Sequence, residues 1–307
     1  MKIAIIDMGT NTFHLLIADV TGKEFKFLFE TREAVKLGVG GINKGLITED
    51  AITRALNTLT RYDTIIKEQQ VEQAVAFGTS AIRSARNGSE LVQLIKEKTG
   101  IETKIISGEE EASLIYQGIK LAMNLGEENN LIMDIGGGSV EFIIGNIEEI
   151  LWKESFEIGG QRLLEKFKPH DPIYNEEIQN LNHYFEERLS TLFSAITKFR
   201  PRTLVGSSGS FDTFSEIYCL KDGREYPKTP ETPLTFEAFD WIHNELISKS
   251  RSQRMQIPGM IELRVDMIVV ASCLVNFLIS KFSFKKIRVS AFSLKEGVLA
   301  TMMRTPS

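Results

Sequence analysis

The chain has 307 residues, enough for two ordinary domains, with 42% hydrophobic residues, 25% charged residues and a net charge of −5. This composition is typical of a globular protein, and the acidic balance argues against nucleic-acid binding. The chain begins directly with a strand pattern, and no apolar run reaches about 18 residues. We therefore expect no signal peptide, no membrane span and a cytoplasmic location. Cys219 and Cys273 stand apart in apolar sequence, which favours buried thiols over a disulfide or metal site.

The first half of the chain is expected to form three strands and then alternating helices and strands. The three strands cover residues 2–7, 13–20 and 24–30. The later elements, in chain order, are a helix at 49–69, a strand within 71–83, a helix at 89–100, a strand at 102–107 and a helix at 109–123. Ser107 followed by Glu110 fits a capping box at the start of the last of these helices.

The second half restarts the same cycle after a polar break at 124–130. Its expected elements are strands at 131–135, 140–145 and near 149–158, a helix at 177–198, a strand, turn and helix start in 202–214, a surface loop at 220–234, a helix at 264–281, and a strand, turn and helix from 286. Residues 3–18 and 131–144 share an apolar run, an Asp-x-Gly, a small polar turn and an apolar strand. This internal repeat predicts two similar domains that face one another.

The two repeated turns combine a carboxylate with small residues. Asp7 and Asp134 end their strands, and two such groups can share a divalent cation, mainly through waters because Mg²⁺ keeps much of its hydration shell. Small turn residues leave backbone N–H groups accessible to phosphate. The expected phosphate-binding residues of the two turns are Gly9, Thr10, Asn11, Thr12, Gly136, Gly137, Gly138 and Ser139. A hairpin with a polar tip would explain either turn alone, but the recurrence favours a two-sided phosphate clamp.

A third glycine-rich turn lies between a strand and a helix. Backbone N–H groups and a helix N-terminus there would favour an anion. The residues concerned are Gly206, Ser207, Ser208 and Gly209. The alternative is a loop that needs small residues for structural reasons.

Two further segments carry charged groups suited to phosphate chemistry. Arg83 follows a strand and can bind phosphate oxygens bidentately, although a surface arginine is an equal alternative. Three glutamates at 109–111 stabilise a helix N-terminus, and one of them can instead deprotonate an attacking water; periodicity does not select which. No histidine spacing suits a metal, and no Ser-His-Asp or Cys-His arrangement is visible. Direct attack by water is therefore the simplest chemistry.

These motifs together resemble the exopolyphosphatase / guanosine pentaphosphate phosphohydrolase family of the actin-like ATPase superfamily, in its short two-domain form. The matching segments span nearly the whole chain in the family's order. They are "IDMGTNTFHLLIA", "GTSAIRSARN", "ISGEEEASLIYQGI", "MDIGGGSVEFIIG", "VGSSGSFDT" and "IPGMIELRVDMIVVAS".

The resemblance implies an α/β fold with two ribonuclease-H-like domains. Each would hold a mixed five-stranded sheet flanked by helices, with the active-site cleft between the domains. The expected domains are residues 1–124 and 125–307, and the last helix, about 294–307, is expected to pack back on the first domain.

The resemblance also implies a hydrolase that acts on phosphoanhydrides with Mg²⁺ or Mn²⁺. Its substrate would be inorganic polyphosphate, guanosine pentaphosphate or both, which implies a link to the stringent response. The family's catalytic base corresponds to Glu111, and its phosphate-contacting arginine to Arg83. Asp7 and Asp134 would position the metal. A homodimer, with no nucleic-acid or membrane partner, is also expected.

Some features depart from the family pattern. Thr10 and Thr12 replace the usual serines but keep the hydroxyl groups, and Lys295 stands where arginine is frequent. The helical domains that longer members add after about residue 307 are absent, which argues against processive action on long polyphosphate unless a dimer supplies that surface. Two alternatives are an actin-like small-molecule kinase and a weakly catalytic sensor of guanosine tetra- or pentaphosphate.

Overall fold

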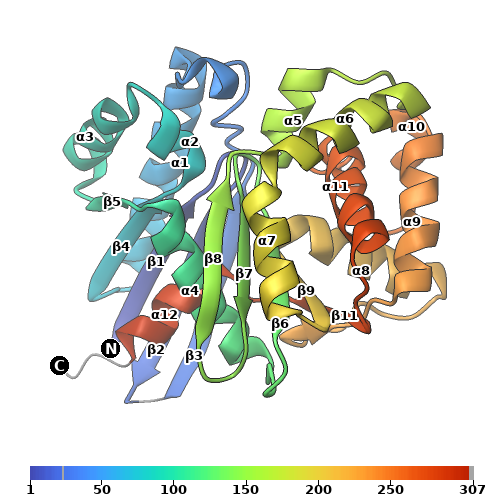
Figure 1. Ribbon diagram of the computed structural model, residues 1–307. Helices are drawn as coiled ribbons and strands as arrows, with labels where there is room; N and C mark the ends of the chain where they lie inside the picture. The colour runs from blue at the N-terminus through green and yellow to red at the C-terminus, as the bar shows by residue number, and fades with distance from the viewer. Residues whose placement is uncertain (23, 304–307) are drawn as a thin grey trace. The chain divides into compact units, whose positions relative to one another are not determined.

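The chain forms two compact units in the computed structural model, which describes residues 1–22 and 24–303. The first unit contains Met1–Gly118 and the helix that begins at Leu294, and the second contains Ile119–Ser293. Each unit is built on one mixed β-sheet with helices packed against it (Figure 1). Residues 304–307, the end of the expected last helix, lie outside the described residues.

The first unit has a five-stranded sheet in the order β3-β2-β1-β4-β5. Its strands are β1 (Lys2–Met8), β2 (Phe13–Thr21), β3 (Glu24–Glu33), β4 (Gln73–Gly78) and β5 (Thr103–Ile105). β1 pairs antiparallel with β2 and parallel with β4, and β4 pairs parallel with β5. β1 is apolar on both faces because both faces are covered: Ala4 and Ile6 belong to one hydrophobic cluster, and Ile3 and Ile5 to another.

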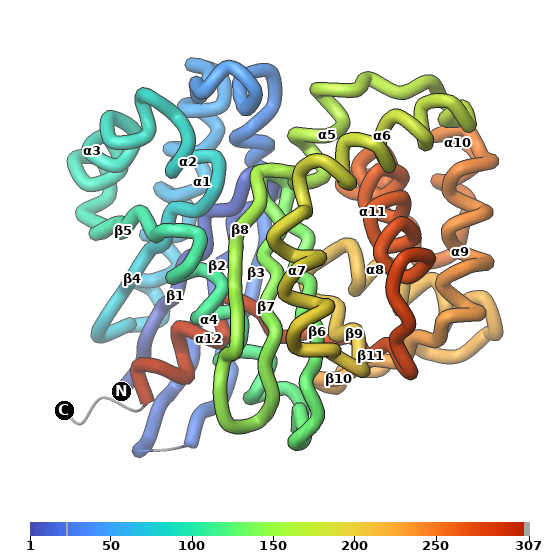
Figure 2. The backbone as a smooth tube through the Cα atoms, viewed as in Figure 1, coloured from blue at the N-terminus to red at the C-terminus, as the bar shows by residue number. Residues whose placement is uncertain are grey.

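Helices cover the two faces of this sheet. They are the short 3₁₀ helix η1 (Ile42–Lys44), α1 (Glu49–Glu68), α2 (Ser80–Ser84), α3 (Gly88–Thr99), α4 (Gly108–Ala122), which continues into the second unit, and α12 (Leu294–Met302). Leu59 of α1 and Leu91 of α3 pack in the cluster on one face, and Val298 and Leu299 of α12 pack in the cluster on the other. Figures 1 and 2 both show α12 beside β1, although the two elements lie at opposite ends of the sequence.

The start of α4 shows half of the expected capping box. The Ser107 hydroxyl accepts a hydrogen bond from the N–H of Glu110 at 3.1 Å. The Glu110 carboxylate pairs with the Lys104 ammonium at 2.5 Å. The serine therefore caps the helix, while the glutamate joins it to β5.

The second unit repeats the strand order of the first. Its strands are β6 (Asn130–Ile135), β7 (Val140–Gly145), β8 (Ile150–Phe156), β9 (Thr203–Ser207), β10 (Glu231–Thr232) and β11 (Lys286–Ser290). The order β8-β7-β6-β9-β11 corresponds to β3-β2-β1-β4-β5, and the two-residue β10 adds a sixth strand at the edge beside β11. The predicted fold class is confirmed, and the internal repeat in the sequence corresponds to two sheets of the same topology.

Seven helices are described in the second unit between β8 and the link to α12. They are α5 (Gly160–Phe167), α6 (Asn175–Arg188), α7 (Ser190–Phe199), α8 (Ser208–Lys221), α9 (Phe236–Ser248), α10 (Arg251–Arg254) and α11 (Met267–Lys281). The apolar helix α11 packs against α5, α6 and α9 in the core of this unit (Figure 1). Within the described residues, none of the helices combines the length and the apolar character needed to cross a bilayer.

The expected single helix at 177–198 is wrong, because the segment forms two helices, α6 and α7, that meet at Leu189. Leu189 has φ −105° and ψ 20°, outside the helical range, and its side chain is fully buried. Backbone hydrogen bonds of helical spacing still flank it, from Leu189 to Phe185 and from Phe193 to Leu189. Because the apolar spacing continues through the bend, the sequence pattern carries no sign of it.

Candidate active site

Three of the segments singled out in the sequence follow parallel strands of the first unit. β1, β4 and β5 run parallel, so their carboxyl ends share one edge of the sheet. The first turn follows β1, α2 with Arg83 follows β4, and α4 with Glu111 follows β5. The carboxyl edge of such a sheet is where α/β proteins usually bind ligands.

The first turn is narrow, and its carbonyl groups accept hydrogen bonds from backbone N–H groups of the protein. The N–H of Gly9 donates to the carbonyl of Thr12 at 3.1 Å, and a Cβ at Gly9 would lie 2.9 Å from that oxygen. The carbonyls of Thr10 and Asn11 accept hydrogen bonds from the N–H groups of Gly38 and Lys36, at 2.9 and 2.8 Å. The backbone of the turn is therefore held from one side by residues 36–38.

Arg83 and Glu111 form a half-buried ion pair. Their side chains are 18% and 10% exposed, and Arg83 Nη1 lies 2.6 Å from Glu111 Oε2. The same nitrogen donates to the carbonyl of Ile106 at 3.2 Å, which holds the guanidinium at the end of β5. The two residues selected separately from the sequence as phosphate ligand and base thus lie in direct contact.

The second turn has the same internal bond as the first. The N–H of Gly136 donates to the carbonyl of Ser139 at 3.1 Å, as Gly9 does to Thr12. The carbonyls of Gly136, Gly137 and Gly138 all accept hydrogen bonds from N–H groups at the start of α5, at 2.8 to 3.3 Å. No hydrogen bond within the described residues engages the N–H of Gly137 or Gly138. These two donors are suited to bind phosphate oxygens.

Gly159 is required for this contact between the second turn and α5. A Cβ there would lie 2.5 Å from the backbone carbon of Gly137 and 2.5 Å from the nitrogen of Gly138. Both distances are well inside van der Waals contact, so any larger residue would push α5 away from the turn.

Asp134 is the penultimate residue of β6, and its carboxylate is almost completely buried. Ser208 Oγ donates to Oδ1 at 2.7 Å, and Ser293 Oγ donates to Oδ2 at 2.5 Å. Burial raises the pKa of Asp134 above its ordinary value, while hydrogen bonds from Ser293, Ser208 and Ser207 and the positive charge of Arg264 act in the opposite direction. The carboxylate is therefore satisfied by neutral hydroxyl donors rather than by a salt bridge.

The third glycine-rich turn supplies the Ser208 hydroxyl that binds Asp134, and its two glycines pack tightly against neighbouring side chains. A Cβ at Gly206 would lie 2.0 Å from the ring of Phe211, and one at Gly209 would lie 2.0 Å from the guanidinium of Arg264. Packing against these side chains thus explains both glycines. Ser207 is fully buried, and Ser208 uses its hydroxyl on Asp134. A phosphate contact by this turn stays a prediction.

One buried carboxylate at the site was not singled out from the sequence. Glu141 lies directly opposite Asp134 in the β6–β7 pairing and is 1% exposed. Its Oε1 accepts hydrogen bonds from Ser139 and Ser155, both at 2.7 Å. In the first unit His14 occupies the same place opposite Asp7. A glutamate inside an otherwise apolar strand of the repeat was the signal that could have identified it.

The residues fit a hydrated Mg²⁺ better than a fully protein-ligated metal. Among residues 1–22 and 24–303, no group of three His, Cys, Asp or Glu side chains is placed to hold an ion. Mg²⁺ prefers oxygen ligands and usually keeps several waters beside one or two carboxylates. Asp7 in the first unit and Asp134 in the second are each a carboxylate of the kind that a hydrated Mg²⁺ accepts. Metal binding by either residue stays a prediction.

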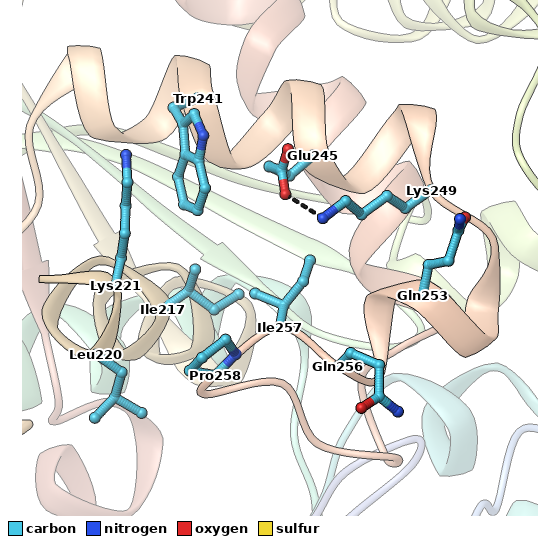
Figure 3. Close-up of a pocket in the computed structure, with 10 residues that line it drawn as sticks. All are labelled: Ile217, Leu220, Lys221, Trp241, Glu245, Lys249, Gln253, Gln256, Ile257 and Pro258. Carbon is cyan, nitrogen blue, oxygen red and sulfur yellow. Dashed lines mark ion pairs between the residues drawn. The ribbon is translucent and has the colours of Figure 1, made fainter. Parts of the chain in front are cut away.

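A separate cavity of about 290 Å³ lies between α8, α9 and the segment after α10 (Figure 3). It is lined by none of the predicted site residues. The Lys221 ammonium lies over the Trp241 ring, 3.7 Å from its centroid, and Lys249 pairs with Glu245 at 2.5 Å. The charged side chains Lys221, Glu245 and Lys249 of this cavity therefore interact with other residues that line it.

Known proteins are similar to this chain over almost its full length. The sequence model of the Ppx/GppA phosphatase family matches residues 16–305. An exopolyphosphatase of Cytophaga hutchinsonii has a crystal structure with a TM-score of 0.96 and 46% identity, and the match covers 99% of this chain and 98% of that one. A Ppx/GppA enzyme of Aquifex aeolicus has a TM-score of 0.80 at 26% identity over 98% of this chain and 99% of that one. A Haemophilus influenzae protein, provisionally named an exopolyphosphatase, is 26% identical over 301 residues, 98% of this chain and 91% of that protein.

Proposed function

The chain belongs to the Ppx/GppA phosphatase family, and from this we propose that it is a phosphoanhydride hydrolase. It would release the terminal phosphate of inorganic polyphosphate, of guanosine pentaphosphate, or of both. The name of the 46% identical Cytophaga hutchinsonii structure favours polyphosphate.

The contact between Arg83 and Glu111 is the observation that carries this proposal. Glu111 would accept a proton from the attacking water, and its ion pair with Arg83 at 2.6 Å holds the carboxylate in one orientation. The same guanidinium can bind oxygens of the transferred phosphoryl group, since arginine presents several donors in a rigid fork. The pair would thus place the group that takes a proton from water, Glu111, next to the cation that binds phosphate, Arg83.

The two turns would stabilise the negative charge of the phosphoryl group. The N–H groups of Gly137 and Gly138, whose carbonyls are held by α5, would donate to its oxygens. A bound Mg²⁺ or Mn²⁺ would neutralise phosphate charge, with Asp7 and Asp134 as the carboxylates that hold it. Most of the rate enhancement would therefore come from positioning and electrostatics.

The proposal is tested by measuring phosphate release from polyphosphate for Glu111→Gln. We expect kcat to fall about 10²- to 10⁴-fold, the usual contribution of a general base. Glu109→Gln is the matched control, because Glu109 lies in the same first turn of α4 but is exposed. Full activity of Glu111→Gln would exclude Glu111 as the base.

The same assay separates the candidate substrates and the alternative functions. Specificity constants for polyphosphates of several lengths, compared with that for guanosine pentaphosphate, give the preference. ATP consumption that depends on an acceptor would indicate a kinase, and tight nucleotide binding without turnover would indicate a sensor. The expected homodimer stays a prediction, which light scattering would test against the monomer mass of 34.6 kDa.

A further inference from the structure

The cavity between α8, α9 and the segment after α10 lies apart from the candidate active site (Figure 3). Its volume of about 290 Å³ is at the lower end of the range for small-molecule sites, about 300–1,000 Å³. The Trp241 ring and the side chains of Ile217, Ile257 and Pro258 give it apolar walls. The cavity therefore suits the size and polarity of a small molecule with an apolar body.

The segment that closes one side of the cavity is held in place by close packing and buried hydrogen bonds. Gly259 has φ +90°, and a Cβ there would lie 2.9 Å from the backbone nitrogen of Ile217, so the segment packs directly against α8. Arg254, which is 3% exposed, donates to the carbonyl of Val265 at 3.0 Å and to the carboxylate of Asp171 at 2.7 Å. The cavity is therefore preformed, as sites for small ligands usually are.

The charges that line the cavity are placed unequally. At one end Lys249 pairs with Glu245 at 2.5 Å, so these two charges offset one another. On the opposite side in Figure 3, the Lys221 ammonium lies over the Trp241 ring, 3.7 Å from its centroid. No carboxylate among residues 1–22 and 24–303 forms an ion pair with Lys221. One positive charge is thus left beside the aromatic wall.

We propose that this cavity binds a small molecule with a flat apolar body and one carboxylate group. The body would lie against Ile217 and Ile257, and the carboxylate would accept a hydrogen bond from the Lys221 ammonium. Such a charge-assisted bond is about twice as strong as a neutral one. At an exposed site it also outweighs the contact of an ammonium with an aromatic ring. The inference does not depend on the proposed function, since no residue of the candidate active site lines the cavity.

The alternative is that Lys221 only lays its alkyl chain along the Trp241 ring and keeps its ammonium in water, as exposed lysines often do. The cavity would then be a surface hollow without preference for an anion. Lys198 provides the matched control, because its ammonium lies over the ring of Phe199, 4.8 Å from the centroid, and it does not line the cavity.

The experiment adds naphthoate, or its neutral amide naphthamide, to the full-length protein. The chain contains two tryptophans, Trp152 and Trp241, so a ¹H–¹⁵N spectrum has two indole signals, and Trp241→Phe identifies the one from the cavity. We expect naphthoate to shift the Trp241 signal with a Kd of about 1 mM, usual for a ligand of this size, and to leave the Trp152 signal in place. Naphthamide should bind about tenfold more weakly, because it lacks the charge that Lys221 would pair with.

Lys221→Met keeps the alkyl chain but removes the ammonium. We expect this variant to bind naphthoate and naphthamide within about twofold of one another, whereas Lys198→Met should keep the tenfold preference. The inference is overturned if naphthoate does not shift the Trp241 signal, if the wild type binds both probes equally, or if Lys221→Met keeps the preference. The comparison of the two probes on the wild type decides the matter even where a variant does not fold.

Discussion

Arg83 shows how a single side chain can serve both structure and the proposed chemistry. It holds Glu111 and the end of β5 with the same nitrogen, at 2.6 Å from the carboxylate and 3.2 Å from the carbonyl of Ile106. At 18% and 10% exposure, the ion pair is screened by water much less than a surface pair. Loss of the arginine would leave the glutamate charge poorly solvated and free to turn.

Substitution of Arg83 should therefore lower turnover. For Arg83→Gln we expect phosphate release from polyphosphate to fall about 10²- to 10³-fold, the usual effect of losing one donor to transition-state charge. Arg83→Lys, which keeps the charge but not the fork of donors, should fall less. Steady-state kinetics would show this, with the exposed Arg86→Gln as a control that stays at the wild-type rate. Equal rates for Arg83→Gln and Arg86→Gln would remove Arg83 from the site.

At the scale of elements, α12 depends on a glycine for its packing. A Cβ at Gly297 would lie 1.7 Å from the backbone carbonyl oxygen of Leu114 in α4. Helix propensity alone favours alanine over glycine by about 1 kcal/mol in a helix interior. The close approach of the two helices reverses that preference, because backbone atoms of α4 have no rotamer by which to move aside.

Gly297→Ala should therefore destabilise the protein although it improves the local helix. We expect the free energy of unfolding to fall by about 1–3 kcal/mol, the usual cost of overpacking. Urea unfolding followed by circular dichroism measures this change. Thr301→Ala, at an exposed position of the same helix, should change the stability by less than about 0.5 kcal/mol. A gain in stability for Gly297→Ala would mean that α12 does not pack against α4 this closely.

The contact between α9 and α11 contains a buried histidine. His243 is 5% exposed, and its Nδ1 lies 3.0 Å from the hydroxyl of Ser272 in α11. Burial lowers the pKa of His243 from its ordinary value of 6.5 to about 4, so the folded protein holds the neutral ring. When the chain unfolds, the ring regains its ordinary proton affinity. Stability from this residue is thus fully present above pH 6.5 and is lost as the pH falls towards 4.

We expect His243 to contribute up to about 3 kcal/mol to the loss of stability between pH 6.5 and pH 4, at about 1.4 kcal/mol for each pKa unit. Denaturant titrations at several pH values would measure the slope for the wild type and for His243→Gln. The variant starts from a lower stability but should lose less of it on acidification, because its side chain does not titrate. An equal acid loss in both proteins would show that other groups cause it.

At the scale of the whole molecule, the two units repeat one plan. In each, an aspartate is the penultimate residue of the central strand, a glycine-led turn closes with a 3.1 Å hydrogen bond, and a second polar residue lies opposite the aspartate. The second unit adds the serine donors of Asp134, and the first adds Arg83 and Glu111. The repeated turns would thus bind phosphate and metal, while the residues proposed to act on water come from one unit only.

Removal of divalent cations should abolish activity without unfolding the chain. With excess EDTA we expect phosphate release to fall to background and to return on addition of Mg²⁺ or Mn²⁺, because the Arg83 guanidinium alone would not offset the phosphate charge that the metal neutralises. The melting temperature should change by less than about 2 °C, since each unit has a separate hydrophobic core. Activity that persists in EDTA would rule out the proposed metal dependence.

Local sequence patterns predicted most of the elements, because the spacing of apolar residues depends only on neighbouring positions. They failed at Leu189, where the apolar spacing continues through the bend between α6 and α7. They also passed over Glu141, whose importance depends on the strand that lies opposite. Both cases concern an element's environment, which a local pattern does not contain.

The sequence by itself determined the duplicated turns, the fold class and the family. Each of these can be recognised from short local motifs and from the order in which the motifs follow one another along the chain. Only the tertiary structure decided which glutamate of residues 109–111 meets Arg83, and that Asp134 is held by Ser208 and Ser293. These partners lie 28, 74 and 159 residues apart in sequence. Contacts over such separations depend on how strands and helices pack, and no periodicity within one segment specifies them.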